Sequence, residues 1–462
     1  MTLIKSISGI RGTIGGKPNE GLSPVDIVRF TSAYGTWLKS HSNNNKLKVV
    51  IGRDARISGE MVSNIVVGTL QGLGIDVIDL GFSTTPTVEI AVTMEQANGG
   101  IIITASHNPK QWNALKLLNE KGEFLSAENG ADLLQIAEDN AFDYAEVDDL
   151  GSYKKDDSYL DKHIQSILEL ELVDVEAIKS KNFKVAIDCV NSTGGIFIPA
   201  LLKALGVTKI LELYCDPTGE FPHNPEPLPE NLTEISKQIK EYGADVGFVV
   251  DPDVDRLCMV CENGEMFGEE YTLVAIADYI LKHTKGNTVS NLSSTRALRD
   301  VTEKNGGEYF ASSVGEVNVV TVMKDKNAVI GGEGNGGVIY PAAHYGRDAL
   351  VGIALFLSHF AKSEVKTCSE LRASYPDYHI SKNKIQLTPE IDVDDILIRM
   401  GIKYSNEDVN DIDGVKINFD EEWVHLRKSN TEPIIRIYSE SKTMAAADAL
   451  AQRIIEEING FI

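Results

Sequence analysis

Two polar segments carry residue types that can do chemistry. The first, TASHNP at residues 104–109, places the Ser106 hydroxyl beside His107, and Lys116 follows ten residues after Ser106. A serine beside a histidine can be a nucleophile, a phosphate carrier or a turn residue. The Gly-x-Ser-x-Gly elbow of hydrolases is absent, because Thr104 and Asn108 flank the pair. Taken alone, a Ser-His pair is more often part of a turn than of a reaction centre.

The second segment, DPDVDR at residues 251–256, indicates a metal site. Asp251, Asp253 and Asp255 alternate after an apolar run, and in extended backbone that spacing points three carboxylates to one side. Converging carboxylates raise one another's pKa unless a cation joins them, and hard oxygen ligands suit Mg²⁺. An EF-hand is rejected, because Arg256 stands where its loop needs glycine. A solvated acidic turn is the weaker alternative.

A glycine-rich segment, GGEGNGG at residues 331–337, matches the spacing of a dinucleotide loop. That site needs a helix directly afterwards, and Pro341 interrupts the following segment. We therefore interpret Glu333 and Asn335 as residues that bind a polyhydroxyl ligand. A plain glycine turn explains the segment equally well.

A fourth segment, RKSNTEP at residues 427–433, offers the donors expected around a phosphate dianion. These donors are Arg427, Ser429, Asn430 and Thr431, with Arg436 shortly after them. By itself the segment is more often an exposed turn. Near the N-terminus, SGIRG at residues 8–12 places Arg11 between glycines and says little alone.

A strand–helix–strand pattern that recurs three times positions these segments. Its copies begin with apolar strands at 47–52, 183–188 and 287–292, and each has a polar loop, a helix, a glycine and a second strand. Continuous apolar runs at 99–104 and 245–250 fit strands buried on both faces of a sheet. Because ligands bind at the carboxyl ends of such strands, the polar segments that follow are the expected site.

The last part of the chain alternates apolar and polar residues at 411–439 and ends in a helical pattern at 442–459. We therefore predict three related α/β domains and a C-terminal α+β domain around a central cleft. The predicted domains are residues 1–155 with Ser106, 156–258 ending in the acidic segment, 259–370 with the glycine-rich segment, and 371–462.

Composition narrows the function classes. The 462 residues carry a formal net charge of −24, which disfavours nucleic acid and anionic membranes as partners. No apolar run is long enough to span a membrane, and we expect a soluble, cytoplasmic protein. Cys258 and Cys261 form a C-x-x-C pair without a second such pair, so a buried strand is favoured over a zinc site.

The five segments, in this order, make the whole chain resemble the α-D-phosphohexomutase superfamily. The resemblance implies that Ser106 carries a phosphoryl group, and that Mg²⁺ is held by Asp251, Asp253, Asp255 and an oxygen of the Ser106 phosphate. It also implies that Lys116 transfers a proton and that Arg11 contacts phosphoryl oxygens. The other implied positions are supporting His107 and Arg256, sugar-binding Glu333 and Asn335, and phosphate-binding Arg427, Ser429, Asn430, Thr431 and Arg436.

The implied reaction interconverts hexose 6-phosphates and hexose 1-phosphates through a 1,6-bisphosphate, which also primes the serine. The sugar loop ends in Asn335-Gly336-Gly337 rather than the Ser-Gly-His of some subgroups. With the YGRD segment at 345–348, this ending favours phosphoglucosamine mutases, on the route to UDP-N-acetylglucosamine. A phosphoglucomutase/phosphomannomutase is the main alternative; a non-catalytic sugar-phosphate-binding relative and a phosphatase are weaker ones. We expect a monomer or homodimer.

Overall fold

The computed structural model describes residues 2–6, 9–42, 44, 46–386, 391–428 and 434–461. The chain forms two compact units. The first comprises Met1–Thr272 and Asn335–Leu371, and the second comprises Leu273–Gly334 and Arg372–Ile462. In the described part of the chain, no helix combines the length and the apolar character needed to cross a bilayer.

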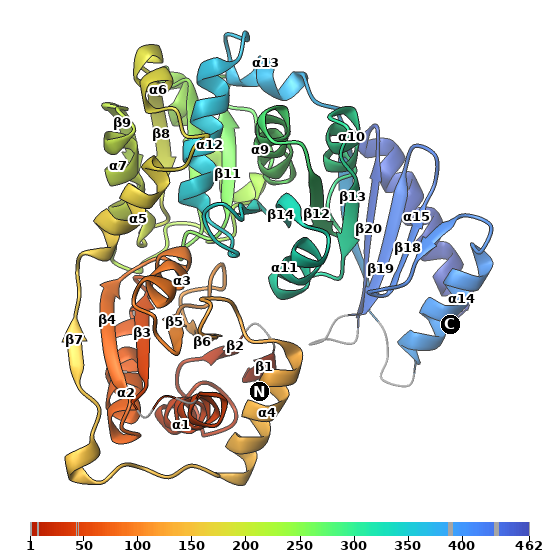
Figure 1. Ribbon diagram of the computed structural model, residues 1–462. Helices are drawn as coiled ribbons and strands as arrows, with labels where there is room; N and C mark the ends of the chain where they lie inside the picture. The colour runs from red at the N-terminus through yellow and green to blue at the C-terminus, as the bar shows by residue number, and fades with distance from the viewer. Residues whose placement is uncertain are drawn as a thin grey trace. The chain divides into compact units, whose positions relative to one another are not determined.

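The first unit begins with a mixed seven-stranded sheet in the order β1-β2-β6-β5-β3-β4-β7 (Figure 1). The strands are β1 (Ile4–Ser6), β2 (Gly9–Thr13), β3 (Lys48–Arg53), β4 (Asp76–Phe82), β5 (Gly99–Ile103), β6 (Trp112–Leu118) and β7 (Tyr153–Lys155). β3 runs parallel to β4 and β5, whereas β6 is antiparallel to β5 and β2. The parallel pair β3–β5 therefore ends at one edge of the sheet, where its two following loops meet.

Helices cover both faces of this sheet. α1 (Pro24–His41), α2 (Gly59–Gly72) and α4 (Ala127–Asp139) pack in one core cluster, and α3 (Thr85–Met94) packs in the other. α1 begins at a capping box in which the Ser23 and Asp26 side chains each accept from the other's backbone N–H. α2 buries Val62, Val66 and Leu70, which lie four residues apart on one face.

A second sheet of the first unit has the order β11-β10-β8-β9. Its strands are β8 (Lys184–Asp188), β9 (Lys209–Leu213), β10 (Val246–Val250) and β11 (Leu257–Cys261). β8 is parallel to β9 and β10, and β11 is antiparallel to β10. Cys258 and Cys261 are buried, unbridged residues of β11, as the strand interpretation predicted.

The other elements of the first unit are one short strand and several helices. They are η1 (Val147–Asp149), α5 (Tyr159–Leu168), α6 (Val175–Lys181), α7 (Gly194–Ala204), η2 (Pro229–Asn231), α8 (Thr233–Tyr242), β15 (Gly337–Ile339) and α12 (Ala349–Lys362). Two further helices, α9 (Glu269–His283) and α13 (Cys368–Ala373), begin in the first unit and end in the second. α12 begins where the Asp348 carboxylate accepts from the backbone N–H groups of Leu350 and Val351.

The second unit holds a parallel sheet and an antiparallel one. In the former, β12 (Asn287–Asn291) lies between β13 (Tyr309–Ser312) and β14 (Ala328–Glu333), with α10 (Ala297–Lys304) and α11 (Glu316–Asp325) beside it. The latter has the order β16-β20-β19-β18-β17. Its strands are β16 (His379–Gln386), β17 (Asp408–Asn410), β18 (Val415–Asn418), β19 (Trp423–Lys428) and β20 (Ile434–Ser441).

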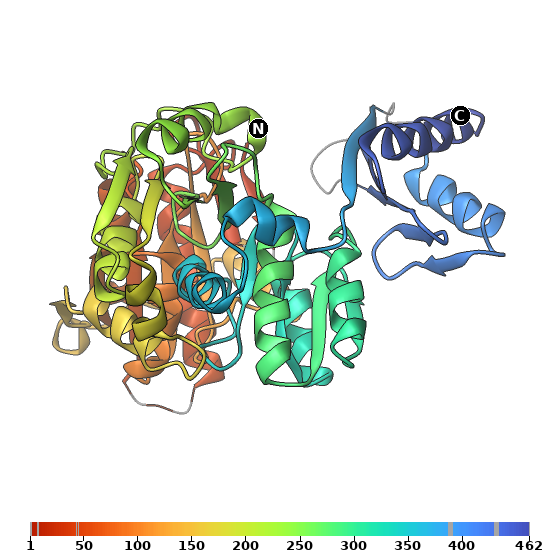
Figure 2. The ribbon, with the colours of Figure 1, turned by 90° about the horizontal axis from the view of Figure 1, so that it is seen from above.

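Two helices, α14 (Val393–Lys403) and α15 (Met444–Asn459), share one hydrophobic cluster with the antiparallel sheet (Figure 2). The fold class predicted from the sequence is confirmed, because β3–α2–β4, β8–α7–β9 and β12–α10–β13 are the three repeated units and the C-terminal domain differs from them. β16 and α14 add to the predicted C-terminal meander.

Candidate active site

The candidate site lies where the loops at the carboxyl ends of strands from two sheets of the first unit meet. The loop after β5 holds Ser106, and the loop after β10 holds the three aspartates. Ser106 Oγ donates a hydrogen bond to Asp251 Oδ2 over 2.6 Å, and Thr85 N donates to the Asp253 carbonyl over 2.9 Å. The first contact joins the two loops that the sequence singled out, and the second joins the acidic loop to the start of α3 (Thr85–Met94), at the strand ends where ligands bind in α/β folds.

The three carboxylates converge, but not for the reason that the sequence suggested. One oxygen from each of Asp251, Asp253 and Asp255 lies within 4.8 Å of the others, and all three residues are buried. The segment is a turn rather than extended backbone, and Val254 has φ +63°. A β-branched residue in that left-handed conformation costs roughly 1–2 kcal/mol. A strained turn, not the two-residue period of a strand, therefore brings the carboxylates together.

The chemistry of this triad fits a metal ion. In the described part of the chain, Asp253 Oδ1 and Asp255 Oδ1 are buried with no hydrogen-bond donor. Buried carboxylate oxygens without donors are costly, and such oxygens are the ligands of hard divalent cations. The triad could therefore bind a metal ion. Glu262, which an EF-hand would require as a ligand, instead accepts from the backbone N–H of Ser369 over 3.0 Å.

The triad is electrostatically uneven. Burial raises the pKa of Asp251 well above its ordinary value, and the charges of Asp255 and Asp253 raise it further. Asp255 is equally buried, but the Arg347 guanidinium and the Lys116 ammonium lower its pKa below the usual range. A negative charge is therefore less favourable at Asp251, the carboxylate that Ser106 contacts, than at Asp255.

Lys116 reaches the triad from β6. Its Nζ lies 2.6 Å from Asp253 Oδ2 and 3.1 Å from Asp255 Oδ2, and the side chain is 8% exposed. Burial opposes the charge, but these two carboxylates raise the pKa of Lys116 above its ordinary value. Lys116 is therefore an ammonium in this arrangement and can donate a proton.

His107, Arg11 and Arg256 lie around the Ser106 loop. His107 Nδ1 is 3.4 Å from Ser106 Oγ, and the Arg256 charge, followed by burial, lowers the pKa of His107 well below 6.5. The imidazole is therefore neutral at physiological pH. Arg11 belongs to β2, and burial and then Arg256 lower its pKa. The Arg256 backbone N–H donates to Asp251 Oδ1 over 3.1 Å.

Asn335 belongs to the first unit, and its Oδ1 accepts from the Gly337 N–H over 3.2 Å. Glu333, in the second unit, ends β14, and its Oε1 accepts from Asn291 Nδ2 over 2.8 Å and from the Gly315 N–H over 3.0 Å. Arg427 Nε pairs with Asp413 at 2.8 Å, and Arg427 lies opposite the exposed Arg436 on β20. Ser429, Asn430 and Thr431 lie outside the described residues.

Two residues of the site had no predicted role in it, although one of them, Arg347, lies in the YGRD segment at 345–348. Arg347 Nη2 lies 2.7 Å from Asp255 Oδ2, and Thr85 Oγ1 donates to Asp253 Oδ2 over 2.5 Å. No spacing links either residue to the acidic segment. Thr85 follows the N-cap of α3, and Arg347 precedes that of α12, so helix starts were the available signal.

A cluster of charged side chains surrounds Asp348, the residue after Arg347. Asp348 Oδ2 lies 3.0 Å from His163 Nε2 and 3.1 Å from His344 Nε2, and His344 Nδ1 lies 3.3 Å from Glu89 Oε2. Burial alone would lower the pKa of His344, but the ring nitrogens interact with the carboxylates of Asp348 and Glu89, and these interactions outweigh burial and raise the pKa to about 10. His344 is therefore charged at neutral pH and offsets part of the negative charge of Asp348 and Glu89.

We expect His344 to make stability fall in alkaline solution. Between about pH 6.5 and 10 the native state holds a proton on His344 that the unfolded chain has lost. The free energy of unfolding therefore decreases as pH rises, by at most about 1.4 kcal/mol per pH unit. Urea unfolding at both ends of that window should show a smaller decrease for His344→Gln than for the wild type. His41→Gln, at an exposed histidine, should behave as the wild type does; an equal decrease in all three proteins would contradict the charged state of His344.

Comparison with known proteins identifies the family of the chain. Four family descriptions match successive parts of the chain: "Phosphoglucomutase/phosphomannomutase, alpha/beta/alpha domain I" at residues 3–143, domain II at 158–264, domain III at 268–378 and the C-terminal domain at 386–457. The chain belongs to the phosphoglucomutase/phosphomannomutase family. The resemblance seen in the sequence is thereby confirmed, and the protein is an enzyme, a mutase of hexose phosphates.

Individual members of the phosphoglucomutase/phosphomannomutase family align along nearly the whole chain. A "Phosphoglucomutase/phosphomannomutase" of Thermococcus kodakarensis is 36% identical and covers 94% of both chains. A "Phosphoglucosamine/phosphogalactosamine mutase" of Sulfurisphaera tokodaii is 32% identical and covers 98% of both. A crystal structure of a phosphoglucomutase/phosphomannomutase family protein from Burkholderia thailandensis superimposes with a TM-score of 0.84 at 26% identity, covering 98% of this chain and 97% of that one.

Proposed function

We propose that this phosphohexomutase interconverts glucosamine 6-phosphate and glucosamine 1-phosphate by way of a phosphorylated Ser106. The observation that carries the mechanism is the Ser106 hydroxyl, 2.6 Å from Asp251 within a buried triad of carboxylates. A hydroxyl in that position becomes a phosphoryl carrier when cations offset the charge of the transferred group. Lys116, Arg11, Arg256 and Arg347 are among the cations nearby.

The proposed transfer starts from the phosphorylated serine. The free hydroxyl of a hexose monophosphate attacks phosphorus, the bond from phosphorus to Ser106 Oγ breaks, and a sugar 1,6-bisphosphate forms. The hydroxyl loses one proton and Oγ gains one, and we assign this transfer to Lys116. Arg11 would contact the phosphoryl oxygens. Mg²⁺ held by the triad and an oxygen of the Ser106 phosphate would neutralise charge on the phosphoryl group.

The second half of the proposed cycle reverses the first. The bisphosphate turns end for end, Ser106 Oγ attacks the other phosphorus, and the sugar hydroxyl that is released takes the proton. A hexose 1,6-bisphosphate supplied from solution would prime an unphosphorylated serine in the same way. We assign sugar hydroxyls to Glu333 and Asn335, support of the phosphoserine to His107 and Arg256, and the distal phosphate to Arg427, Arg436 and the segment at 429–431.

The choice of amino sugar rests on the sugar loop and on relatives. The Sulfurisphaera tokodaii protein named above carries an amino-sugar mutase name, whereas the name of the Thermococcus kodakarensis protein supports glucose and mannose phosphates. The latter substrates are therefore the second candidate.

The test of substrate choice compares kcat/KM with Mg²⁺ present for glucosamine 6-phosphate, glucose 1-phosphate and mannose 1-phosphate, each primed with its own bisphosphate. We expect a preference of about tenfold or more for the amino sugar, equivalent to about 1.4 kcal/mol of differential transition-state binding. Equal or greater efficiency with glucose or mannose phosphate would leave the mechanism standing and replace the proposed substrate by the second candidate.

A further inference from the structure

Arg56 is a buried cation at the carboxyl end of β3, close to the Ser106 loop. It is 1% exposed, and its partner Asp54 is fully buried. Arg56 Nε donates to Asp54 Oδ2 over 3.0 Å, and the Arg56 backbone N–H donates to Asp54 Oδ1 over 2.9 Å. Buried ion pairs contribute little net stability compared with apolar side chains of similar size, so stability alone is a weak explanation for this pair.

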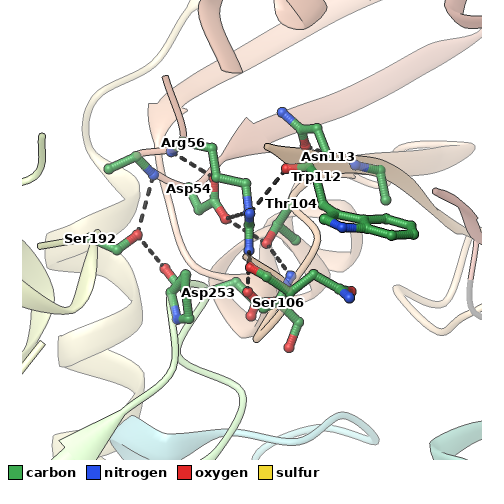
Figure 3. Close-up of polar contacts among 12 residues, drawn as sticks. Asp54, Arg56, Thr104, Ser106, Trp112, Asn113, Ser192 and Asp253 are labelled. Carbon is green, nitrogen blue, oxygen red and sulfur yellow. Dashed lines mark hydrogen bonds and ion pairs between the residues drawn. The ribbon is translucent and has the colours of Figure 1, made fainter. Parts of the chain in front are cut away.

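The remaining N–H groups of the guanidinium all donate hydrogen bonds to backbone carbonyls of the Ser106 loop (Figure 3). Nη1 donates to the carbonyls of Pro109 over 2.8 Å and Trp112 over 3.0 Å. Nη2 donates to the carbonyls of Asn108, over 2.6 Å, and Ser106. Together with Nε, these bonds use the five N–H groups of the planar arginine fork. A lysine has three donors on one atom and cannot reproduce this pattern.

Asp54 reaches the same loop by a second route. Thr104 Oγ1 donates to Asp54 Oδ2 over 2.6 Å and accepts from the backbone N–H of Ser106 over 2.9 Å. Ser106 itself has φ +48°, a left-handed conformation that non-glycine residues seldom adopt. Such a conformation persists where the surroundings hold it from several sides. Here both backbone groups of Ser106 are held. The N–H donates to the Thr104 hydroxyl, which is bonded to Asp54, and the carbonyl accepts from Arg56.

One hydroxyl links this arrangement to the acidic loop. Ser192, which follows β8, accepts from the backbone N–H of Ala55 over 3.3 Å and donates to the carbonyl of Pro252 over 2.7 Å. Figure 3 shows Ser192 between the Asp54–Arg56 segment and the segment at Asp253. Pro252 lies between two of the three aspartates. The loop that holds the triad and the loop that holds Ser106 are therefore both bonded to the segment at 54–56, the former through Ser192 and the latter through Arg56.

We propose that Arg56 is a positioning residue for phosphoryl transfer: with Asp54 it sets the backbone of the Ser106 loop, and Ser192 keeps that loop in register with the triad. This inference rests on the proposed role of Ser106 as the phosphoryl carrier. It assigns Arg56 no contact with substrate. Its effect is on where Oγ stands relative to the acidic loop, and errors of about 1 Å in such placement cost about 100-fold in rate.

The test replaces Arg56 with lysine, which keeps the charge and removes the fork. We expect kcat per folded enzyme to fall about 100-fold while KM for the hexose phosphate changes little, because the substrate contacts remain. Hydrogen exchange of the amides at 105–113 should become faster in the same variant. The matched control is Arg53→Lys, at the last residue of β3 and three residues before Arg56, which should keep both wild-type kcat and wild-type exchange.

Ser192→Ala serves as the milder variant if Arg56→Lys does not fold. We expect about a tenfold loss of kcat with KM unchanged. Wild-type kcat in Ser192→Ala, or in folded Arg56→Lys, would overturn the positioning role, and so would a lower melting temperature without a change in kcat per folded enzyme. If the wild-type enzyme formed no phosphoserine, the proposed function would fail, whereas faster exchange at 105–113 would still support the hold of Arg56 on the loop.

Discussion

Ser106→Ala should abolish mutase turnover, with a loss of kcat of about 10⁴-fold or more. The variant loses the atom to which the phosphoryl group is proposed to attach. The aspartates are proposed metal ligands, and Lys116 is held as an ammonium by Asp253 and Asp255. Initial rates with bisphosphate-primed enzyme, measured over a wide range of enzyme concentration, will give the size of the loss.

The control for Ser106→Ala is Ser180→Ala, at an exposed serine of α6 in the same unit. It should retain the wild-type rate. Circular dichroism and the melting temperature of Ser106→Ala should stay close to those of the wild type, because the change removes one hydroxyl from a loop held by Arg56. Turnover by Ser106→Ala within tenfold or so of the wild type would rule out this serine as the carrier.

Asp251→Asn should separate the metal role from the fold. Burial and the other two aspartates raise the pKa of Asp251, so its charge destabilises the native state at neutral pH. Without added metal, we therefore expect the amide variant to melt at the same temperature as the wild type or at a higher one. The rise in melting temperature that Mg²⁺ produces by binding the native state should be lost, and kcat should fall by about 10²–10³-fold.

The control for Asp251→Asn is Asp161→Asn, which removes an exposed carboxylate near the start of α5. It changes net charge equally and should keep both the Mg²⁺ response and the rate. An Asp251→Asn protein that Mg²⁺ stabilises as strongly as the wild type would remove Asp251 from the metal site. A variant that lost the native fold without added metal would instead show that the carboxylate is needed for folding.

Much of the fold could be predicted from local patterns. Continuous apolar runs that end in polar segments predicted β5 and β10, and glycines after helical runs predicted the ends of α2, α7 and α10. These signals are short in range, because strand burial and helix termination depend on neighbouring residues. β16 and α14 were harder to predict, because β16 pairs along its length with β20, far away in the chain.

The site was predictable where its residues cluster in the sequence. Ser106, His107 and the aspartates lie in two short segments, and the structure brings these segments together. Arg347 and Arg56 were not predictable, since Arg347 meets Asp255 across 92 positions and Arg56 meets the Ser106 carbonyl across 50. Even the convergence of the aspartates depends on the left-handed Val254. Contacts of this kind depend on which loops the folded sheets bring together, and they leave no periodic trace in the sequence.

The most direct test of the central proposal is to locate the phosphoryl group. The wild-type enzyme, Ser106→Ala and Ser180→Ala would each be incubated with glucosamine 1,6-bisphosphate and Mg²⁺, digested and analysed by peptide mass spectrometry. We expect one added phosphoryl group on the peptide that contains Ser106 in the wild type and in Ser180→Ala, its removal when glucosamine 6-phosphate is added, and none in Ser106→Ala. A phosphoryl group on another residue, or full turnover without any phosphopeptide, would contradict the role of Ser106 as the carrier.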